Sequence, residues 1–240
     1  MPITMLKARV RTLVPLGARA ALRRWQRRVR LQRGLRTFGT DPGAALLPGS
    51  RLLSELVDAW ANEGWSARGE YLGACVAEAL ACRGPILECG SGLTTLLLGL
   101  VARRRGLFVW TLEHSAEWGA RVARELAAIG DLPVELNVKA LRQEREFDWY
   151  DPPLPSMPPL FSLVVCDGPP HSTRGGRYGL APTMQDRLPP GCVILLDDAA
   201  RGPEQEIAAR WAMELRAEYE VLGREKPYIR MALSPPGVPA

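Results

Sequence analysis

A carboxylate followed closely by two glycines forms the segment of this chain best suited to bind a ligand. Glu88-Cys89-Gly90-Ser91-Gly92 comes between a short apolar run and an apolar helical pattern, which predicts a buried strand, a tight turn and the start of a helix. Glycine allows positive φ and a close approach of the backbone to a ligand. A helix that begins behind such a turn presents unpaired N–H groups. The spacing differs from the Gly-x-Gly-x-x-Gly of dinucleotide binders, which favours a ligand with a cationic or neutral head over a pyrophosphate.

Acidic residues also follow other apolar runs. Besides Glu88, the ends of the expected strands carry Glu113, Asp167, Asp197 and Asp198. In open parallel sheets, ligands bind beyond the carboxyl ends of the strands. One such acid could merely cap a helix or face solvent, but four acidic strand ends predict a ligand site with a negative rim.

The elements that must position these acids alternate between apolar strands and helices. Strands are expected at 85–89, 107–113, 134–138, 161–166 and 192–196, and helices at 94–104, 115–130, 180–188 and 203–215. Residues 219–222 and 228–233 are expected to pair as a final antiparallel hairpin. Fully apolar strands are covered on both faces. The sequence therefore predicts an α/β fold with a doubly wound, mostly parallel, Rossmann-like seven-stranded sheet, a C-terminal antiparallel hairpin and N-terminal helices.

Three segments are expected along the chain: a basic helical segment at 1–37, a helical cap at 38–84 and a ligand-binding domain at 85–240. Within the cap, 38–50 is predicted to be a connector and helices are expected at 52–60 and 71–80. Ser50 is expected to cap the first of these helices, and Gly64 and Gly84 to end the two.

The basic segment contains eleven Lys or Arg and no acid, whereas the rest of the chain has twenty basic and twenty-six acidic residues. Leu16, Leu22, Trp25 and Val29 recur there at near-helical spacing between arginines. Such a helix could pack on the main domain with its charges solvated, lie on an anionic membrane surface or bind nucleic acid. The sequence leaves these three alternatives open, but the arginines exclude a secretory signal.

The composition limits the class of protein. With 240 residues and 47% hydrophobic content, the chain can form one globular domain with a full core, and it contains no apolar run of membrane-spanning length. Its five cysteines have no paired spacing, which favours buried free thiols in a reducing compartment and hence the cytoplasm, with peripheral membrane contact left open. The chain has two histidines and no Cys-x-x-Cys, which argues against a structural zinc site.

In the order and spacing of these motifs, residues 69–234 resemble the class I S-adenosylmethionine-dependent methyltransferases. The Asp167-Gly168-Pro169-Pro170 motif is similar to that of a bacterial branch of small methyltransferases. The resemblance implies an enzyme that transfers a methyl group from S-adenosyl-L-methionine to oxygen or nitrogen of a small-molecule or glycan-like acceptor. The cofactor-binding residues that it implies are Glu88, Gly90, Ser91, Gly92, Thr94, Glu113, His114 and Asp167.

Two residues are candidates for the chemical step. His171 has the near-neutral pKa suited to a general base if the acceptor is a hydroxyl, and it lies beside the expected point of transfer. The resemblance implies that Asp167 flanks the methionyl part of the cofactor. His171 could equally be a loop histidine with a local hydrogen bond. Arg174, Arg177 and Tyr178 follow in the same loop, where they could hold an anionic acceptor or pair with neighbouring acids.

A metal-dependent mechanism is the main alternative. In catechol-type O-methyltransferases, acids after the fourth and fifth strands bind a divalent metal, and Asp167, Asp197 and Asp198 fall at those positions. The chain departs from that family at Asp198, where the family has Asn, and at Pro169-Pro170. A divalent metal is therefore left open but not favoured.

The sequence also bears on alternative functions and partners. A nicotinamide oxidoreductase is disfavoured by the missing third glycine, and a nucleic-acid methyltransferase by the acidic main domain. A non-catalytic binding module docked through the basic segment stays open, as does a homodimer. Trp149 and Tyr150, in the Pro-rich stretch 147–160, are expected either to wall the acceptor pocket or to pack at the surface.

Overall fold

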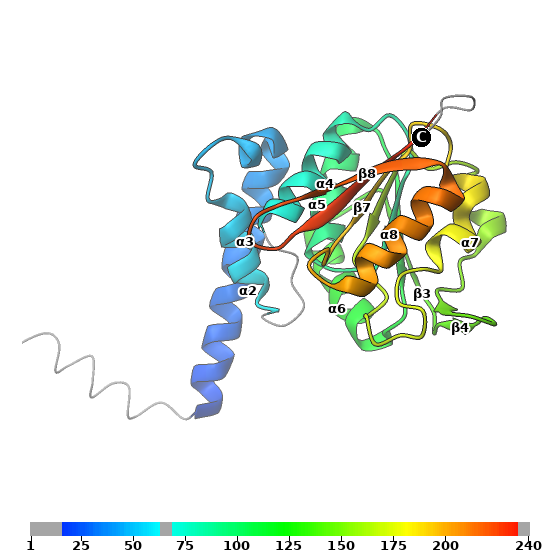
Figure 1. Cartoon of the computed structure of the whole chain (residues 1–240). Helices are drawn as coiled ribbons and strands as arrows, with labels where there is room; N and C mark the ends of the chain where they lie inside the picture. The colour runs from blue at the N-terminus through cyan, green and yellow to red at the C-terminus, as the bar shows by residue number, and fades with distance from the viewer. Residues whose placement is uncertain (1–15, 63–68, 235–240) are drawn as a thin grey trace, which may run out of the picture.

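A seven-stranded sheet forms the centre of the molecule in a computed structural model that describes residues 16–62 and 69–234 (Figure 1). The strands lie in the order β3-β2-β1-β6-β7-β9-β8. Their bounds are β1 Ile86–Cys89, β2 Val109–Glu113, β3 Val134–Val138, β6 Leu163–Cys166, β7 Val193–Leu196, β8 Ala217–Leu222 and β9 Tyr228–Leu233. β9 runs antiparallel to both β7 and β8, while the other neighbours in the sheet are parallel. The predicted mostly parallel sheet with a C-terminal hairpin is confirmed.

Helices cover both faces of this sheet. Alternate side chains of a strand point to opposite faces, so Ile86 packs in one core cluster and Leu87 in the other. The first cluster contains side chains of α4 (Gly69–Ala81), α5 (Leu93–Arg105) and α6 (Ala116–Ile129), and the second contains those of α7 (Leu180–Met184) and α8 (Gly202–Leu215). The central strands β1 and β6 are buried at every residue, which explains their continuous apolar sequence.

The N-terminal helices extend the first core layer. α2 (Leu16–Thr40) buries Leu31, Leu35 and Phe38 in the cluster shared with α5 and with α3 (Leu52–Trp60). α2 thus runs across the expected segment boundary after residue 37. The connector predicted at 38–50 is wrong in part, because α2 continues to Thr40 and a short 3-10 helix, η1, spans Pro42–Leu46.

Only some of the side-chain caps that the sequence predicts are present at the helix ends. Ser115 caps α6 as predicted, since its Oγ accepts a hydrogen bond from Trp118 N at 3.2 Å. The expected Ser50 cap is wrong: Arg51 holds the N-cap position of α3 and its side chain makes no capping bond. The stop expected at Gly64 lies outside the described residues.

The connections between the parallel strands carry short elements. The Pro-rich stretch contains β5 (Asp148–Trp149), which pairs with β4 (Arg142–Gln143), and a single 3-10 turn, η2 (Leu154–Ser156). The helix expected at 180–188 divides into α7 and the 3-10 helix η3 (Gln185–Arg187). All five cysteines are free and buried, as predicted. None of the helices within 16–62 and 69–234 combines the length and apolarity needed to cross a bilayer.

Candidate functional site

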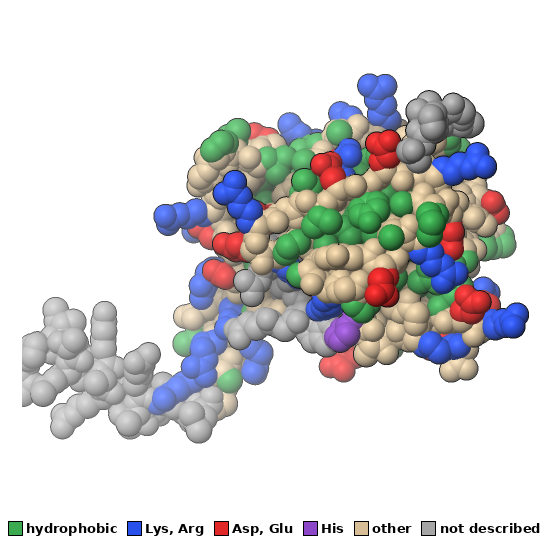
Figure 2. All heavy atoms as spheres, in the orientation of Figure 1, with side chains coloured by type: hydrophobic (Ala, Val, Ile, Leu, Met, Phe, Trp, Pro, Cys, Tyr) green, Lys and Arg blue, Asp and Glu red, His purple; other side chains and the backbone are tan. Residues whose placement is uncertain are grey.

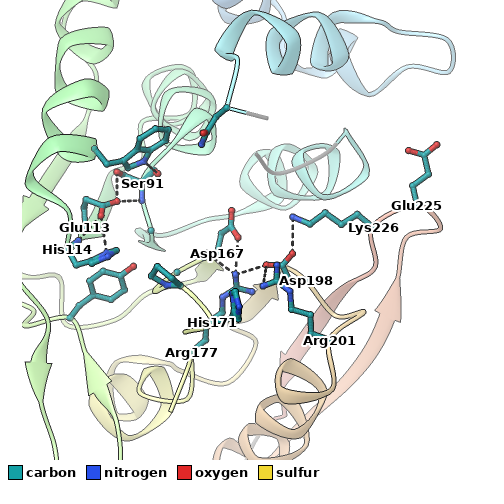
Figure 3. Close-up of a pocket in the computed structure, with 16 residues that line it drawn as sticks. Ser91, Glu113, His114, Asp167, His171, Arg177, Asp198, Arg201, Glu225 and Lys226 are labelled. Carbon is teal, nitrogen blue, oxygen red and sulfur yellow. Dashed lines mark hydrogen bonds and ion pairs between the residues drawn. The ribbon is translucent and has the colours of Figure 1, made fainter. Parts of the chain in front are cut away.

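A cavity of about 590 Å³ opens at the carboxyl edge of the sheet (Figure 3). Its lining includes Gly90 and Ser91 after β1, Glu113 and His114 after β2, Asp167 after β6 and Asp198 after β7. The strand-end residues of four parallel strands therefore meet at one site. This is the edge at which open α/β sheets bind ligands.

The turns after β1 and β6 touch each other on the floor of the cavity. Gly90 has φ of +92°, and a Cβ at this position would lie 2.9 Å from the backbone nitrogen of Gly168. A Cβ on Gly168 would in turn lie 2.4 Å from the hydroxyl of Tyr150. Gly90 therefore requires glycine for conformation and for close approach, and Gly168 requires it for close approach alone. Gly92 differs, because its Cβ would meet open space.

Glu88 lies beneath the cavity rather than along it. Its side chain is fully buried, and its Oε2 accepts hydrogen bonds from Thr95 Oγ1 at 2.7 Å and Thr111 Oγ1 at 2.8 Å. Burial raises its pKa to about 7, although hydrogen bonds from threonines oppose this change. Thr95 also accepts from Gly92 N at 2.8 Å, so Glu88 braces the glycine turn from below. Of the residues expected at the site, Glu88, Gly92 and Thr94 do not line the cavity.

Glu113 is held by donors on both of its carboxylate oxygens. Oε2 accepts from Ser91 N at 3.0 Å and Ser91 Oγ at 2.7 Å, while Oε1 accepts from the backbone nitrogens of His114 and Ser115, each at 2.8 Å. Burial opposes ionisation, but the hydrogen bonds from His114, Ser115 and Ser91 outweigh it and lower the pKa of Glu113. The result is an ionised carboxylate with a fixed orientation.

Aromatic side chains wall the cavity near Glu113. Trp118 on α6 lines it and donates from Nε1 to Ser91 O at 2.6 Å. The Tyr150 hydroxyl is buried with no hydrogen-bond partner among the described residues, and its ring lies 6.2 Å from that of His114. An unpaired polar atom at a cavity wall is a feature that a polar ligand would satisfy. Of the two locations expected for Tyr150, the pocket wall and the surface, the structure shows it in the wall of the cavity.

The helical cap reaches the cavity through a cation–π contact that the sequence analysis missed. The Arg121 guanidinium lies 4.4 Å from the ring of Trp60 on α3 and 4.7 Å from that of Trp118 on α6. Arg121 Nη2 also donates to Trp60 O at 2.5 Å. Because this contact joins α3 to α6, Asn62, just after α3, becomes part of the cavity lining. The spacing of three residues between Trp118 and Arg121 on one helix was the available signal.

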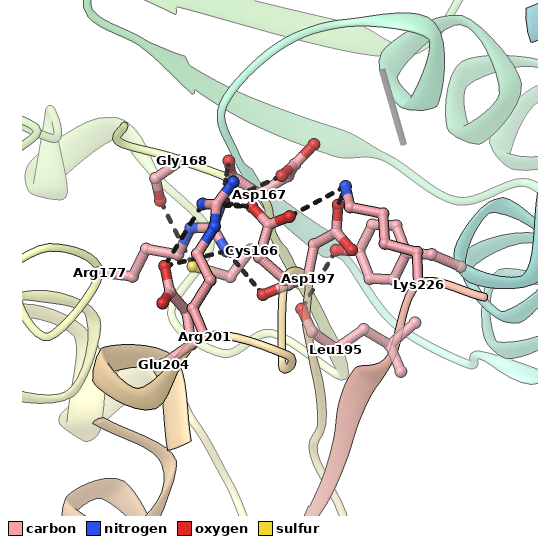
Figure 4. A network of polar contacts seen from close by, with 11 residues as sticks. Cys166, Asp167, Gly168, Arg177, Leu195, Asp197, Arg201, Glu204 and Lys226 are labelled. Atoms are coloured by element: carbon pink, nitrogen blue, oxygen red, sulfur yellow. Dashed lines mark hydrogen bonds and ion pairs between the residues drawn. The ribbon is translucent and has the colours of Figure 1, made fainter. Parts of the chain in front are cut away.

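Arg177 connects the acids that follow β6 and β7 (Figure 4). It is 2% exposed, and its Nη2 lies 3.2 Å from Asp167 Oδ1 and 2.9 Å from Asp198 Oδ2. Burial disfavours its charge, but Asp167 and Asp198 keep its pKa above the ordinary arginine value. Asp167 faces the cavity with 24% of its side chain exposed. Burial and the nearby Asp197 raise the pKa of Asp167 well above its ordinary value, although Arg177 and Lys226 oppose this shift.

Lys226 brings a second cation to these acids from the turn between β8 and β9. Its Nζ lies 2.5 Å from Asp197 Oδ2 and 3.1 Å from Asp198 Oδ1. Burial opposes the lysine charge, but the carboxylates of Asp197, Asp167 and Asp198 raise its pKa above the ordinary value. At the rim, Arg201 Nη1 pairs with Asp198 Oδ2 at 2.9 Å.

This arrangement does not fit a divalent metal. Oxygen atoms of Asp167, Asp197 and Asp198 lie within 4.8 Å of one another, as the catechol-type alternative requires. However, each of the three carboxylates already has a cationic partner in Arg177, Lys226 or both. A divalent ion would have to displace both cations from a buried setting, where they would then lack their counter-charges.

The remaining candidates separate into cavity and scaffold residues. His171 lines the cavity from an exposed loop position. Arg174 does not reach it, because its guanidinium binds Asp148 Oδ1 at 2.6 Å and the neighbouring carbonyls. Tyr178 donates to Glu214 at 2.9 Å, and Trp149 is buried against Gly179. These three residues support the loops rather than the site.

Comparison with known proteins finds similarity in structure only. No protein-family model and no curated protein matches the chain. Precorrin-6y C5,15-methyltransferase from Geobacter metallireducens GS-15 matches 74% of this chain and 95% of its own at 15% identity, with a TM-score of 0.55. The SAH-bound methyltransferase PaMTH1 of Podospora anserina matches 93% and 99% at 19% identity, with a TM-score of 0.53. The O-methyltransferase from Bacillus cereus in complex with SAH matches 83% and 100% at 18% identity, with a TM-score of 0.52. The chain therefore shares the fold of these methyltransferases.

Proposed function

We propose that this protein is an S-adenosylmethionine-dependent methyltransferase that methylates oxygen or nitrogen of a small-molecule or glycan-like acceptor. The observation that carries the proposal is that the Gly90 turn, the ionised Glu113 and the Arg177-paired Asp167 line the same cavity. S-adenosylmethionine, when bound, supplies an electrophilic methyl group on a sulfonium cation. Two of the similar structures are described as SAH complexes, which supports this choice of cofactor.

Glu113 is the residue proposed to hold the ribose diol. Three of its four hydrogen bonds come from backbone N–H groups, which fix the carboxylate in place. The fourth comes from the Ser91 hydroxyl, which can rotate away and leave a lone pair for a ribose hydroxyl. The unpaired Tyr150 hydroxyl and the rings of His114 and Trp118 would border the nucleoside.

Asp167 and His171 are proposed to act on the other side of the cavity. Asp167 faces the cavity beside Arg177, so its carboxyl lies close to a cationic ligand, whose positive charge would favour the ionised form. Within the described part of the chain, the His171 side chain makes no hydrogen bond or ion pair, and it lines the same space. It is the proposed general base for an acceptor hydroxyl, while alignment of the two reactants supplies the rest of the acceleration.

We favour a metal-independent reaction over the catechol-type alternative. Arg177 and Lys226 already pair with the three acids that a metal would need. The buried free thiols support a reducing compartment such as the cytoplasm.

Ligand-induced stabilisation tests the proposal directly. Addition of S-adenosylhomocysteine should raise the melting temperature of the full chain, while NAD should leave it unchanged. Labelled methyl transfer to a panel of hydroxyl and amine acceptors then tests for catalysis. Stabilisation by NAD and not by S-adenosylhomocysteine would support the oxidoreductase alternative. Stabilisation by S-adenosylhomocysteine without transfer to any acceptor would support the non-catalytic module.

A further inference from the structure

α2 has two apolar stripes on different faces. In its C-terminal half, Leu31, Leu35 and Phe38 are at most 4% exposed and pack in the core. In its N-terminal half, the apolar residues are exposed, with Leu22 at 52%, Trp25 at 61% and Val29 at 47%. On a helix with 100° per residue, the side chains of Leu22, Trp25 and Val29 point in directions within about 60° of one another. These directions lie roughly 150° from those of the buried stripe. The exposed stripe therefore faces away from the domain.

The helix that carries this exposed stripe is strongly basic. α2 contains eight arginines and no acidic residue. Figure 1 shows its N-terminal half projecting from the α/β body, and Figure 2 shows basic side chains along it. Arg28 is tied to Glu125 on α6 at 3.5 Å, on the side of the helix that faces the domain. Charge and apolar surface are thus both presented outward by the same segment.

The chemistry of this surface favours a lipid partner over the alternatives. A nucleic-acid backbone would satisfy the arginines, but it offers no apolar surface for Leu22, Trp25 and Val29. A second copy would bring two acid-free helices into contact, with repulsion between their arginines. An anionic bilayer satisfies both features, because its headgroups attract arginine and its interface accepts tryptophan and aliphatic side chains.

We propose that the N-terminal half of α2 docks the protein on an anionic lipid bilayer, with Leu22, Trp25 and Val29 inserted at the boundary between headgroups and acyl chains. The helix would lie in the plane of the interface and would not cross the bilayer. This inference does not depend on the catalytic activity of the cavity.

Vesicle cosedimentation with the full-length protein tests the docking. The protein should sediment with vesicles of phosphatidylcholine mixed with phosphatidylglycerol and much less with vesicles of pure phosphatidylcholine. Trp25→Ser should weaken binding to the mixed vesicles by about tenfold, since it removes a large apolar side chain from the interface. Trp25→Phe should retain most of the binding. Arg23→Gln combined with Arg30→Gln should also weaken it by about tenfold.

Met213 provides the matched control. It is 76% exposed on α8, away from α2, so Met213→Ser removes an exposed apolar side chain without touching the proposed surface. This variant should bind the mixed vesicles as the unchanged protein does. All variants should keep the melting temperature of the unchanged protein, because the replaced side chains are exposed.

Three results would overturn the proposal. The first is equal binding of the unchanged protein and Trp25→Ser to the mixed vesicles. The second is a duplex-binding activity that the arginine variant loses and Trp25→Ser keeps, without vesicle binding. The third is a vesicle-free dimer that Trp25→Ser converts to monomer.

Discussion

The ammonium group of Lys226 lies 2.5 Å from the carboxylate of Asp197, although 29 residues separate them in the chain. The contact arises because β9 pairs antiparallel with β7, with Leu196 opposite Ile229. The turn that precedes β9 is thereby placed beyond the carboxyl end of β7. Glu70 at the start of α4 secures this turn, since its Oε2 accepts from the backbone nitrogens of Arg224 and Glu225 at 2.8 and 3.1 Å.

Replacing Lys226 by methionine should therefore destabilise the protein. Asp197 is fully buried, and removal of one partner of a buried ion pair leaves an uncompensated charge. Lys226→Met should lower the free energy of unfolding by about 2 kcal/mol, a figure reduced from the fully buried case because the lysine is partly exposed. Urea unfolding measures the change, and Lys226→Arg is the control that keeps the charge. Equal stability of the methionine variant and the unchanged protein would show that the pair contributes nothing.

Chelation should leave the reaction unchanged if protein cations take the place of a metal. Methyl transfer, measured with and without EDTA, is expected at the same rate, and added Mg²⁺ is expected not to increase it. A loss of transfer in EDTA that Mg²⁺ restores would instead support the catechol-type mechanism at Asp167, Asp197 and Asp198.

Glu113→Gln should weaken binding of S-adenosylhomocysteine by about tenfold to a hundredfold. The amide keeps the shape of the side chain but loses the charge, and a hydrogen bond to a charged group contributes about 1.5–3 kcal/mol. Titration calorimetry measures the affinity, and the melting temperature without ligand separates binding from folding. Ser91→Ala keeps the Glu113 carboxylate and should retain most of the affinity. An unchanged affinity in Glu113→Gln would remove this residue from the cofactor site.

His171→Ala should reduce kcat by about a hundredfold or more if the acceptor is a hydroxyl, because general-base catalysis typically contributes that much. The affinity for S-adenosylhomocysteine should stay the same. A variant with full activity would assign His171 to the loop alone.

Glu88 should make stability depend on pH between about 4.5 and about 7. Burial raises its folded-state pKa from 4.5 to about 7, so over this range the unfolded state loses the proton while the folded state keeps it. The stabilising effect of the protonated form is complete below pH 4.5 and is lost as the pH rises towards 7. Relative to Glu88→Gln, the unchanged protein should lose about 3 kcal/mol of unfolding free energy between these limits. Parallel urea titrations of the two proteins measure the difference, and a difference that does not vary with pH would mean that the Glu88 pKa is not raised.

The sequence by itself determined the alternation of elements and the class of the sheet. Strands such as β1 and β6 are apolar at every position because both faces are covered, and this local pattern is visible without coordinates. The glycine turn at Gly90 and the acid at Glu113 could be predicted for the same reason, since a strand end and its turn are set by neighbours in the chain. The Ser115 cap is another such local interaction.

Only the tertiary structure decided which acids face the cavity and what neutralises them. Glu88 and Glu113 both follow apolar runs, yet Glu88 points into the layer where Thr111, its register partner on β2, can bond to it. Lys226, Arg177 and the Trp60–Arg121–Trp118 contact join segments far apart in the chain. Their meeting depends on sheet order and helix packing. These are set by the burial of the whole core, so spacing along the chain does not specify them, apart from the local Trp118–Arg121 pair on α6.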